Sequence, residues 1–235
     1  MHPTRRVKKS LAAGRFETML ISMKTKHLIT PLALALAFAL ATTVLAGDHK
    51  LAAHPEFPAE GFATIFDGSN LENISTKGNW KVKEDKSLAL EPREGESGWE
   101  RYGSYLWLPG EHEDFIVDFD FKYTKGGNSG LYFRISDESD ATKHGWEVQI
   151  LDNFEKKEEL VHHDMGGVIK TNPPSENASI EPGEWNQMTV KLQGTHLQVL
   201  INDKLVQDFD LAEKKPRDKE LAPKGKIAIQ DHGQP

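Results

Sequence analysis

The sequence contains no cysteine among its 235 residues. Disulfide bonds and thiol chemistry are therefore excluded, even for an exported protein. Basic residues are also in the minority, with 29 Lys and Arg against 36 Asp and Glu. Nucleic acid binding depends on clustered Lys and Arg that contact phosphates, so this balance argues against a nucleic acid partner.

Long hydrophobic runs are almost absent, and the exception lies from Leu28 to Leu45. A short basic segment that begins at Met23 precedes this run, and Val44-Leu45-Ala46 ends it. This order is the pattern of a cleaved bacterial signal peptide. A transmembrane anchor is the alternative, although Pro31 weakens it and the run has only about the minimum length of a membrane span. We expect a cleaved signal peptide and a periplasmic or secreted mature protein without a membrane span.

The remaining boundaries follow from composition. We interpret residues 1–22 as an extension from a misplaced start codon, 23–46 as the signal peptide, 47–58 as a polar linker and 59–235 as one domain. Residues 1–46 carry seven basic and one acidic side chain, so the remainder keeps 22 basic and 35 acidic ones, a net charge of −13. A neutral carbohydrate substrate is compatible with that charge.

Helical periodicity is missing outside the signal peptide, whereas short alternating segments are frequent. The clearest runs from Phe115 to Tyr123, where every second residue is aromatic or Val. Other predicted strands are 61–66, 80–83, 87–91, 105–108, 126–134, 145–152, 185–192, 197–201, 204–209 and 226–230. We expect residues 210–223, which are charged and contain Pro216, to form a loop with at most a short helical turn. About ten short strands at this spacing predict an all-β sandwich of two antiparallel sheets.

Two neighbouring strands carry polar residues on one face. Regular alternation places Asn128, Tyr132 and Arg134 together on the first strand, and Glu147 with Gln149 on the second. Two such strands side by side would form a polar platform. This arrangement favours a sugar-binding surface.

Five sequence blocks resemble those of the 3-keto-disaccharide hydrolase family. They occur in the family's order, at 128–134, 145–152, 173–179, 182–186 and 229–233. The resemblance implies a concanavalin A-like jelly-roll β-sandwich and cleavage of glycosides whose C3 hydroxyl has been oxidised to a ketone. Family members continue into a further strand after the last block, whereas this chain stops at Pro235, so we expect that strand to be missing here.

A C3 ketone acidifies the proton on C2, so a base can start elimination of the C1 substituent. Glu147 is the predicted base, and the alternative is a carboxylate that only accepts hydrogen bonds from sugar hydroxyls. A standard two-carboxylate glycosidase is disfavoured, because Gln149 follows Glu147 on the same face and Asp152 falls on the opposite one. A non-catalytic carbohydrate-binding domain is the main alternative function.

Several side chains are predicted to bind substrate. Arg134 could bind the ketone or pair with an acidic neighbour, and Asn128 could bind sugar or hold its own turn. Tyr132 could stack on a sugar ring or be half-buried in the sheet. Further predicted ligands are Gln149, Gln230 and Trp185, the last of which could instead pack under a loop.

Histidines provide the remaining candidates. We predict proton transfer by His163 or His232, which lie in the loop after the Glu147 strand and after the last predicted strand. A divalent metal ion held by His163, Asp164 and His232 is an alternative, because imidazole and carboxylate are suitable ligands and such an ion would polarise the ketone. The spacing of these residues is not diagnostic.

Overall fold

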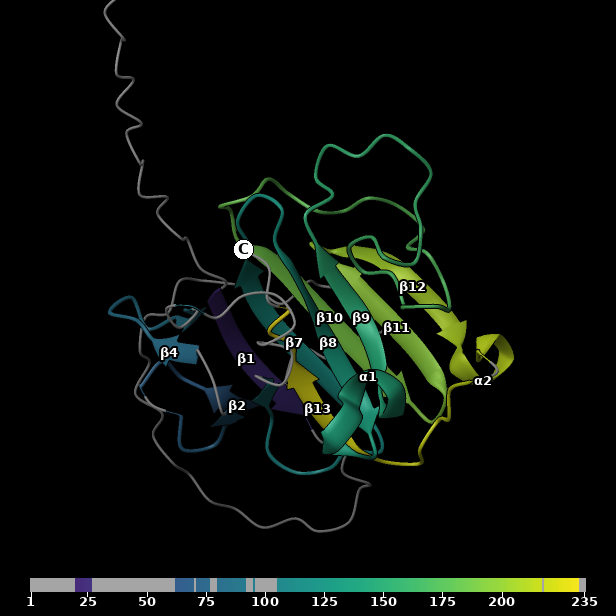
Figure 1. Ribbon diagram of the computed structural model, residues 1–235, viewed down its shortest axis with the longest axis horizontal. Helices are drawn as coiled ribbons and strands as arrows, with labels where there is room; N and C mark the ends of the chain where they lie inside the picture. The colour runs from purple at the N-terminus through teal and green to yellow at the C-terminus, as the bar shows by residue number, and fades with distance from the viewer. Residues whose placement is uncertain are drawn as a thin grey trace, which may run out of the picture.

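The computed structural model describes residues 20–26, 62–69, 71–76, 80–91, 95, 105–216 and 218–232. In this part of the chain, nearly all regular structure is β, and the strands pair antiparallel in two sheets (Figure 1). The predicted all-β sandwich is therefore confirmed.

The larger sheet has the order β12-β11-β10-β7-β1-β5-β4, and β2 pairs with β1 beside this path. Its middle strands, β7 and β10, pair over seven residues from Phe115↔Leu192 to Phe121↔Asn186. The strands are β1 (Leu20–Lys26), β2 (Ala63–Phe66), β4 (Trp80–Val82), β5 (Leu88–Leu90), β7 (Phe115–Lys122), β10 (Asn186–Gln193), β11 (His196–Ile201) and β12 (Lys204–Asp210).

The smaller sheet has the order β3-β6-β13-β8-β9. Strand β8 lies between β13 and β9 and pairs with β9 from Asn128↔Leu151 to Phe133↔Trp146. The strands are β3 (Ser75–Thr76), β6 (Leu106–Trp107), β8 (Asn128–Ile135), β9 (Trp146–Leu151) and β13 (Lys226–Ile229). The two polar strands of the sequence are thus neighbours, as predicted.

The main core lies between the two sheets. Alternate residues of β7, β10 and β11 face the inner side of the smaller sheet, where Leu131, Phe133, Val148 and Ile150 are fully buried. Burial of such apolar side chains is the main stabilising contribution to the sandwich. It also fixes the register, because a shift by one residue would turn every inward side chain outward.

Within the described residues, two short α-helices interrupt the β pattern. Helix α1 (Ala141–His144) follows a 3₁₀ turn, Glu138–Asp140, and the Asp140 side chain accepts a hydrogen bond from the Lys143 N–H at its N-terminus. Helix α2 (Leu211–Lys214) is capped by Asp210 and is the helical turn expected in 210–223. Helix α1 was not predicted, since four residues are too few to show a helical period.

A β-bulge breaks the alternation of β8 near its end. Ala228 pairs with Tyr132 and Lys226 with Ile135, so two residues of β8 oppose the single residue Ile227. Arg134 lies in this bulge with φ of 51°. As a result, Ile135 and not Arg134 shares the face of Tyr132, and both pack in a small apolar cluster outside the main core.

Strand β1 comes from the region predicted to precede the mature protein. Leu20–Lys26 pairs along its whole length with β7 and also with β2 and β5. The predicted linker and most of the predicted signal peptide lie outside the described residues, so these boundaries stay predictions. No helix in the described part of the chain combines the length and hydrophobicity of a membrane span.

Candidate active site

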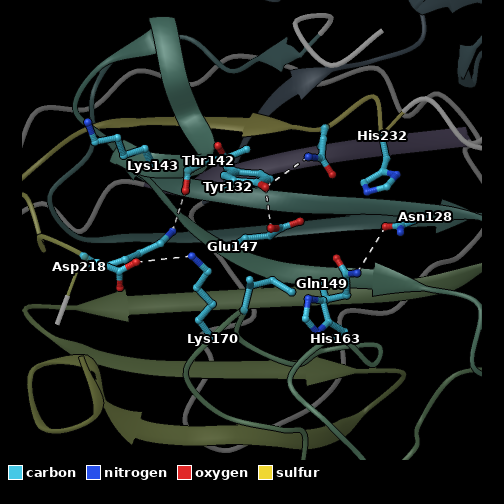
Figure 2. A pocket seen from close by; sticks show the side chains of 13 residues that line it. Asn128, Tyr132, Thr142, Lys143, Glu147, Gln149, His163, Lys170, Asp218 and His232 are labelled. Carbon is cyan, nitrogen blue, oxygen red and sulfur yellow. Dashed lines mark hydrogen bonds and ion pairs between the residues drawn. The ribbon is translucent and has the colours of Figure 1, made fainter. Parts of the chain in front are cut away.

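A cavity of about 360 Å³ opens on the face of the smaller sheet that points away from the core (Figure 2). We call it the Glu147 pocket. Strands β8 and β9 and the segment after β13 provide its floor, and α1 and two loops provide its rim. The lining residues are Asn128, Tyr132, Thr142, Lys143, Glu147, Gln149, His163, Ile169, Lys170, Asp218, Lys219, Gln230 and His232.

Glu147 is the buried carboxylate of this pocket, and only 8% of the residue is exposed. Its Oε2 accepts a hydrogen bond of 2.5 Å from the hydroxyl of Tyr132, its pairing partner across the two strands. Gly130 provides the room for the carboxyl group, because a Cβ atom there would lie 2.3 Å from Glu147 Oε1. Within the sequence Asn-Ser-Gly-Leu-Tyr, Gly130 thus leaves room for the Glu147 carboxyl group and Tyr132 donates a hydrogen bond to it.

The surroundings of Glu147 make it a weak acid. Burial raises the pKa of Glu147 to about 7, and the Tyr132 hydrogen bond and the Lys219 charge only partly oppose that rise. A carboxyl group with this pKa is present in both its ionised and its protonated form near neutral pH. It can therefore both accept and return a proton.

Tyr132 does not offer its ring to a sugar. The ring is buried among apolar residues and meets Tyr105 edge to face at 5.4 Å. Its hydroxyl donates to Glu147 and accepts from Gln230 Nε2 at 3.3 Å. The prediction of a stacking Tyr132 is therefore wrong, and the residue positions the Glu147 carboxylate.

Three amide side chains line the pocket. Gln149 Nε2 lies 3.4 Å from Asn128 Oδ1. When its amide is turned over, the nitrogen instead donates to the Ser129 carbonyl at 2.9 Å and to Glu147 Oε1 at 3.2 Å, an orientation that satisfies both amide atoms. Gln230 Oε1 is buried and has no hydrogen-bond partner among the residues that the structure describes. A buried acceptor of this kind is costly unless a ligand donor reaches it, which suits a sugar hydroxyl.

Lysines form one side of the pocket, and no pattern in the sequence predicted them. Lys219 is buried, and its ammonium donates to the backbone carbonyls of Gly145 and of Thr142, the latter at 3.1 Å. Burial lowers the pKa of Lys219, although the negative charge of Glu147 opposes this. Lys170 lies on the same side and forms an exposed ion pair of 3.5 Å with Asp218, the residue before Lys219 (Figure 2). Both come from loops, where no periodic pattern marks them.

The histidines reach the pocket as the sequence predicted. His163 and His232 both line it, although they come from segments about 70 residues apart. The loop of His163 is held in place by His162, whose Nδ1 accepts the N–H of Lys170 at 3.0 Å. The imidazole rings of His162 and His163 lie 4.1 Å apart between their centroids. Polar groups from two strands, helix α1, two loops and the segment after β13 therefore converge on one buried carboxylate.

Comparison with known proteins shows which family the chain belongs to. A family model described as the 3-keto-alpha-glucoside-1,2-lyase-like domain matches residues 61–235. The chain belongs to this family. The match agrees with the resemblance of the five sequence blocks.

Solved structures agree with the family assignment. A protein from Parabacteroides distasonis ATCC 8503, described as a "putative glycosyl hydrolase", is 27% identical, with a TM-score of 0.57, over 69% of this chain and 87% of its own. A second protein with the same description and organism is 20% identical, with a TM-score of 0.63, over 75% and 90%. No curated protein matches the chain. The chain is thus a glycosyl hydrolase-like member of the family.

Arg134 is not in the pocket of this family member. Its guanidinium donates to three backbone carbonyls, those of Glu113 at 2.9 Å, Gly194 at 2.9 Å and Ala222. The β-bulge turns the side chain away from the face of Tyr132, so the regular alternation assumed from sequence fails there. The prediction that Arg134 binds the ketone is wrong, because the residue joins three backbone segments outside the pocket. Its acidic neighbours are Asp114 and Glu113.

Trp185 also lies elsewhere. It lines a separate cavity with Asp120 and Gln187 of the larger sheet, and Lys122 Nζ lies 5.2 Å from its ring centroid. The indole is only partly exposed and takes no part in the Glu147 pocket. The prediction that Trp185 binds the same substrate is therefore wrong.

The metal site considered for His163, Asp164 and His232 does not form either. The Asp164 carboxylate is buried and accepts from Lys156 Nζ at 2.7 Å and from the Val161 N–H at 2.6 Å, outside the Glu147 pocket. Among the described residues, no group of three or more His, Asp or Glu is arranged to hold a metal ion. These donors do not fit a divalent ion, and we derive no step that uses one.

Proposed function

We propose that this protein cleaves the glycosidic bond of 3-keto-glycosides by elimination between C1 and C2, followed by hydration. The observation that carries the proposal is Glu147, a buried carboxylate with a pKa of about 7 at the floor of a polar pocket. Proton abstraction next to a ketone needs such a base, tuned close to the working pH. The family description and the glycosyl hydrolase-like relatives support the same chemistry.

The reaction begins when ionised Glu147 takes the proton from C2. The electrons of that C–H bond form a C2=C3 enolate, whose oxygen derives from the ketone. Collapse of the enolate restores the ketone, forms a C1=C2 double bond and breaks the bond between C1 and the leaving oxygen. That oxygen takes a proton, which protonated Glu147 can return. Water then adds across C1=C2 and gives the free 3-keto sugar.

The lysines supply the positive charge that this route needs. Negative charge develops on the former ketone oxygen in the first step, and a preorganised cation lowers the energy of that state. The ammonium groups of Lys170 and Lys219 line the same pocket as Glu147. The amides of Asn128, Gln149 and Gln230 would bind the other hydroxyl groups and hold the ring in place.

A direct test uses the 3-keto derivative of p-nitrophenyl glucoside and its unoxidised parent. We expect release of p-nitrophenol from the 3-keto compound and none above background from the parent. Deuterium at C2 should slow the release severalfold if abstraction at C2 limits the rate, because that C–H bond breaks in the first step. Sugar binding by the folded protein without any turnover would instead identify a carbohydrate-binding domain.

We also propose that the protein acts outside the cytoplasm, in the periplasm or as a secreted protein. Support comes from the signal-peptide pattern that ends at Ala46. Cleavage there would remove β1 together with its pairing to β7. Intact-mass analysis and N-terminal sequencing of protein recovered from the periplasm or the medium should give a chain that begins at Gly47. A chain that still contains Leu20–Lys26 would show that β1 is a permanent strand and that this cleavage site is unused.

A further inference from the structure

The charge of the Glu147 pocket is opposite in sign to the net charge of the chain. The chain carries a net charge of −7, whereas three ammonium groups line the pocket, from Lys143, Lys170 and Lys219. The carboxyl groups in the lining are those of Glu147 and Asp218. The carboxyl group of Glu147 is partly protonated near neutral pH, which reduces the negative charge further. The pocket is therefore a site of positive charge in an acidic protein.

The two lysines at the rim keep their charge available to a ligand. Lys170 pairs with Asp218 at 3.5 Å, but both side chains are more than half exposed, at 59% and 69%, and such pairs contribute little. Lys143 is exposed in the last turn of α1. The Asp140 carboxylate lies near this helix, but it caps the helix through Thr142 Oγ1 and the Lys143 N–H and does not line the pocket.

The third lysine, Lys219, is buried. Its ammonium donates to the carbonyls of Thr142 and Gly145, which are neutral groups and leave the charge uncompensated. An ammonium has three N–H donors, so one donor remains for a ligand beyond these two bonds. Burial lowers the pKa of Lys219, and the nearby charge of Lys170 adds to this effect, although Glu147 opposes it. Lys170 and Lys219 therefore act on the same part of the pocket.

Glu147 lies between two unlike halves of the pocket. Figure 2 shows Lys170 and Asp218 to one side of Glu147, and His163 and His232 to the other. C1 and C3 of the sugar are the two neighbours of C2, so they point to opposite halves when C2 lies at Glu147. The enolate oxygen on C3 needs the cations, which places C1 and the leaving group in the histidine half. An anion bound by the lysines then belongs to the ring that carries the ketone.

We propose that this ring also carries a carboxylate at C6, so that the substrates are 3-keto-glycuronides. Lys219 at the floor stabilises the enolate oxygen, and Lys143 and Lys170 at the rim bind the C6 carboxylate. A monoanion matches the charges of the lining, since three ammonium groups face two carboxylates when Glu147 is ionised. This inference rests on the proposed function for the orientation of the ring. It adds the charge class of the substrate.

The test compares the 3-keto derivatives of p-nitrophenyl glucuronide and p-nitrophenyl glucoside, which share the leaving group and the anomeric configuration and differ at C6. At low ionic strength, we expect kcat/KM of wild type to be at least about 10-fold higher for the glucuronide, because the charges are complementary. This preference should shrink when salt is added to about 0.5 M, since exposed charges are then screened. Release of p-nitrophenol measures both rates.

Lysine variants test where the carboxylate binds. In Lys143→Met and in Lys170→Met, the ratio of kcat/KM for glucuronide over glucoside should fall by about 3- to 10-fold, the effect of one lost charged contact. The ratio is informative because it cancels any loss that the two substrates share. Lys157→Met is the matched control and should keep the wild-type ratio, because Lys157 is an exposed lysine outside the pocket.

A wild-type ratio of one or less, or a ratio that neither rim lysine changes, would overturn the carboxylate site. If wild type turns over neither substrate, the proposed function fails and binding decides about the carboxylate site alone. Calorimetric titration should then show tighter binding of methyl glucuronide than of methyl glucoside by wild type and Lys157→Met, with a smaller difference in Lys170→Met. Equal affinities of wild type for the two sugars would reject the site in that case too.

Discussion

Replacement of Glu147 by glutamine is expected to lower kcat on a 3-keto-glucoside by about 10²- to 10⁴-fold, the usual contribution of a general base. Glutamine has nearly the same shape and can still hydrogen-bond Tyr132, but it cannot take the C2 proton. KM should therefore change little, because the amides and lysines that bind the sugar remain. Steady-state kinetics of purified wild type and Glu147→Gln measure both constants.

Two control variants make that result specific. Glu176→Gln removes an exposed carboxylate outside the Glu147 pocket and should leave both constants as in wild type. Asp218→Asn removes the second carboxylate of that pocket, which is exposed and paired with Lys170. Losses of equal size in Glu147→Gln and Asp218→Asn would support a two-carboxylate hydrolysis and contradict elimination by a single base.

The pH dependence of the rate follows from the same carboxyl group. Burial raises the pKa of Glu147 to about 7, and only the ionised form can act as the base. Activity should therefore rise with pH and level off above a midpoint near 7. Because the Tyr132 hydrogen bond lowers the pKa of Glu147, Tyr132→Phe should move this midpoint upward. An unchanged midpoint in Tyr132→Phe would assign the titration to another group.

Stability should respond to pH in the opposite direction. The folded state raises the pKa of Glu147 from 4.5 to about 7, so folding favours the protonated form. This stabilisation is fully present below pH 4.5 and is lost as pH rises through 7. A shift of that size corresponds to roughly 3 kcal/mol. Compared with Glu147→Gln, wild type should thus lose about that much unfolding free energy between pH 4.5 and 8, as urea titrations can measure.

The sequence predicted the fold well because the sandwich depends on repeated local signals. Alternation in Phe115–Tyr123 identified β7, and the predicted strands 197–201 and 204–209 correspond to β11 and β12. The position of Glu147 beside Gln149 was also predictable, since β9 is regular. Where strands pair regularly, side chains alternate between the two faces of the sheet as the sequence predicts.

The site was only partly predictable because much of it depends on irregular backbone. A single bulge moved Arg134 from the polar face and replaced it there with Ile135. Lys170 and Lys219 line the pocket from two loops that are far apart in the sequence. No local sequence pattern predicts contacts between such segments. The unpaired oxygen of Gln230 is likewise a property of the folded protein, although Gln230 itself was among the predicted ligands and does line the pocket.

Replacement of Arg134 by methionine is expected to destabilise the fold by about 3 kcal/mol or more, because three backbone carbonyls lose a charged donor. Methionine keeps most of the apolar part of the side chain. The loss of unfolding free energy therefore measures mainly the removed hydrogen bonds and only to a small extent altered packing. For a domain of this size the melting temperature should fall by about 6–12 °C. Arg134→Lys should lie between wild type and Arg134→Met, since one ammonium cannot replace the fork that reaches Glu113, Gly194 and Ala222.

The same variant distinguishes a structural Arg134 from a substrate ligand. Measured well below its melting temperature, folded Arg134→Met should keep kcat and KM within about threefold of wild type, because the guanidinium lies outside the Glu147 pocket. A ligand to the ketone or its enolate would behave differently, with a large loss of kcat/KM and little loss of stability. Normal melting combined with such a kinetic defect would place Arg134 back in the active site. It would also mean that the β-bulge does not persist when substrate binds.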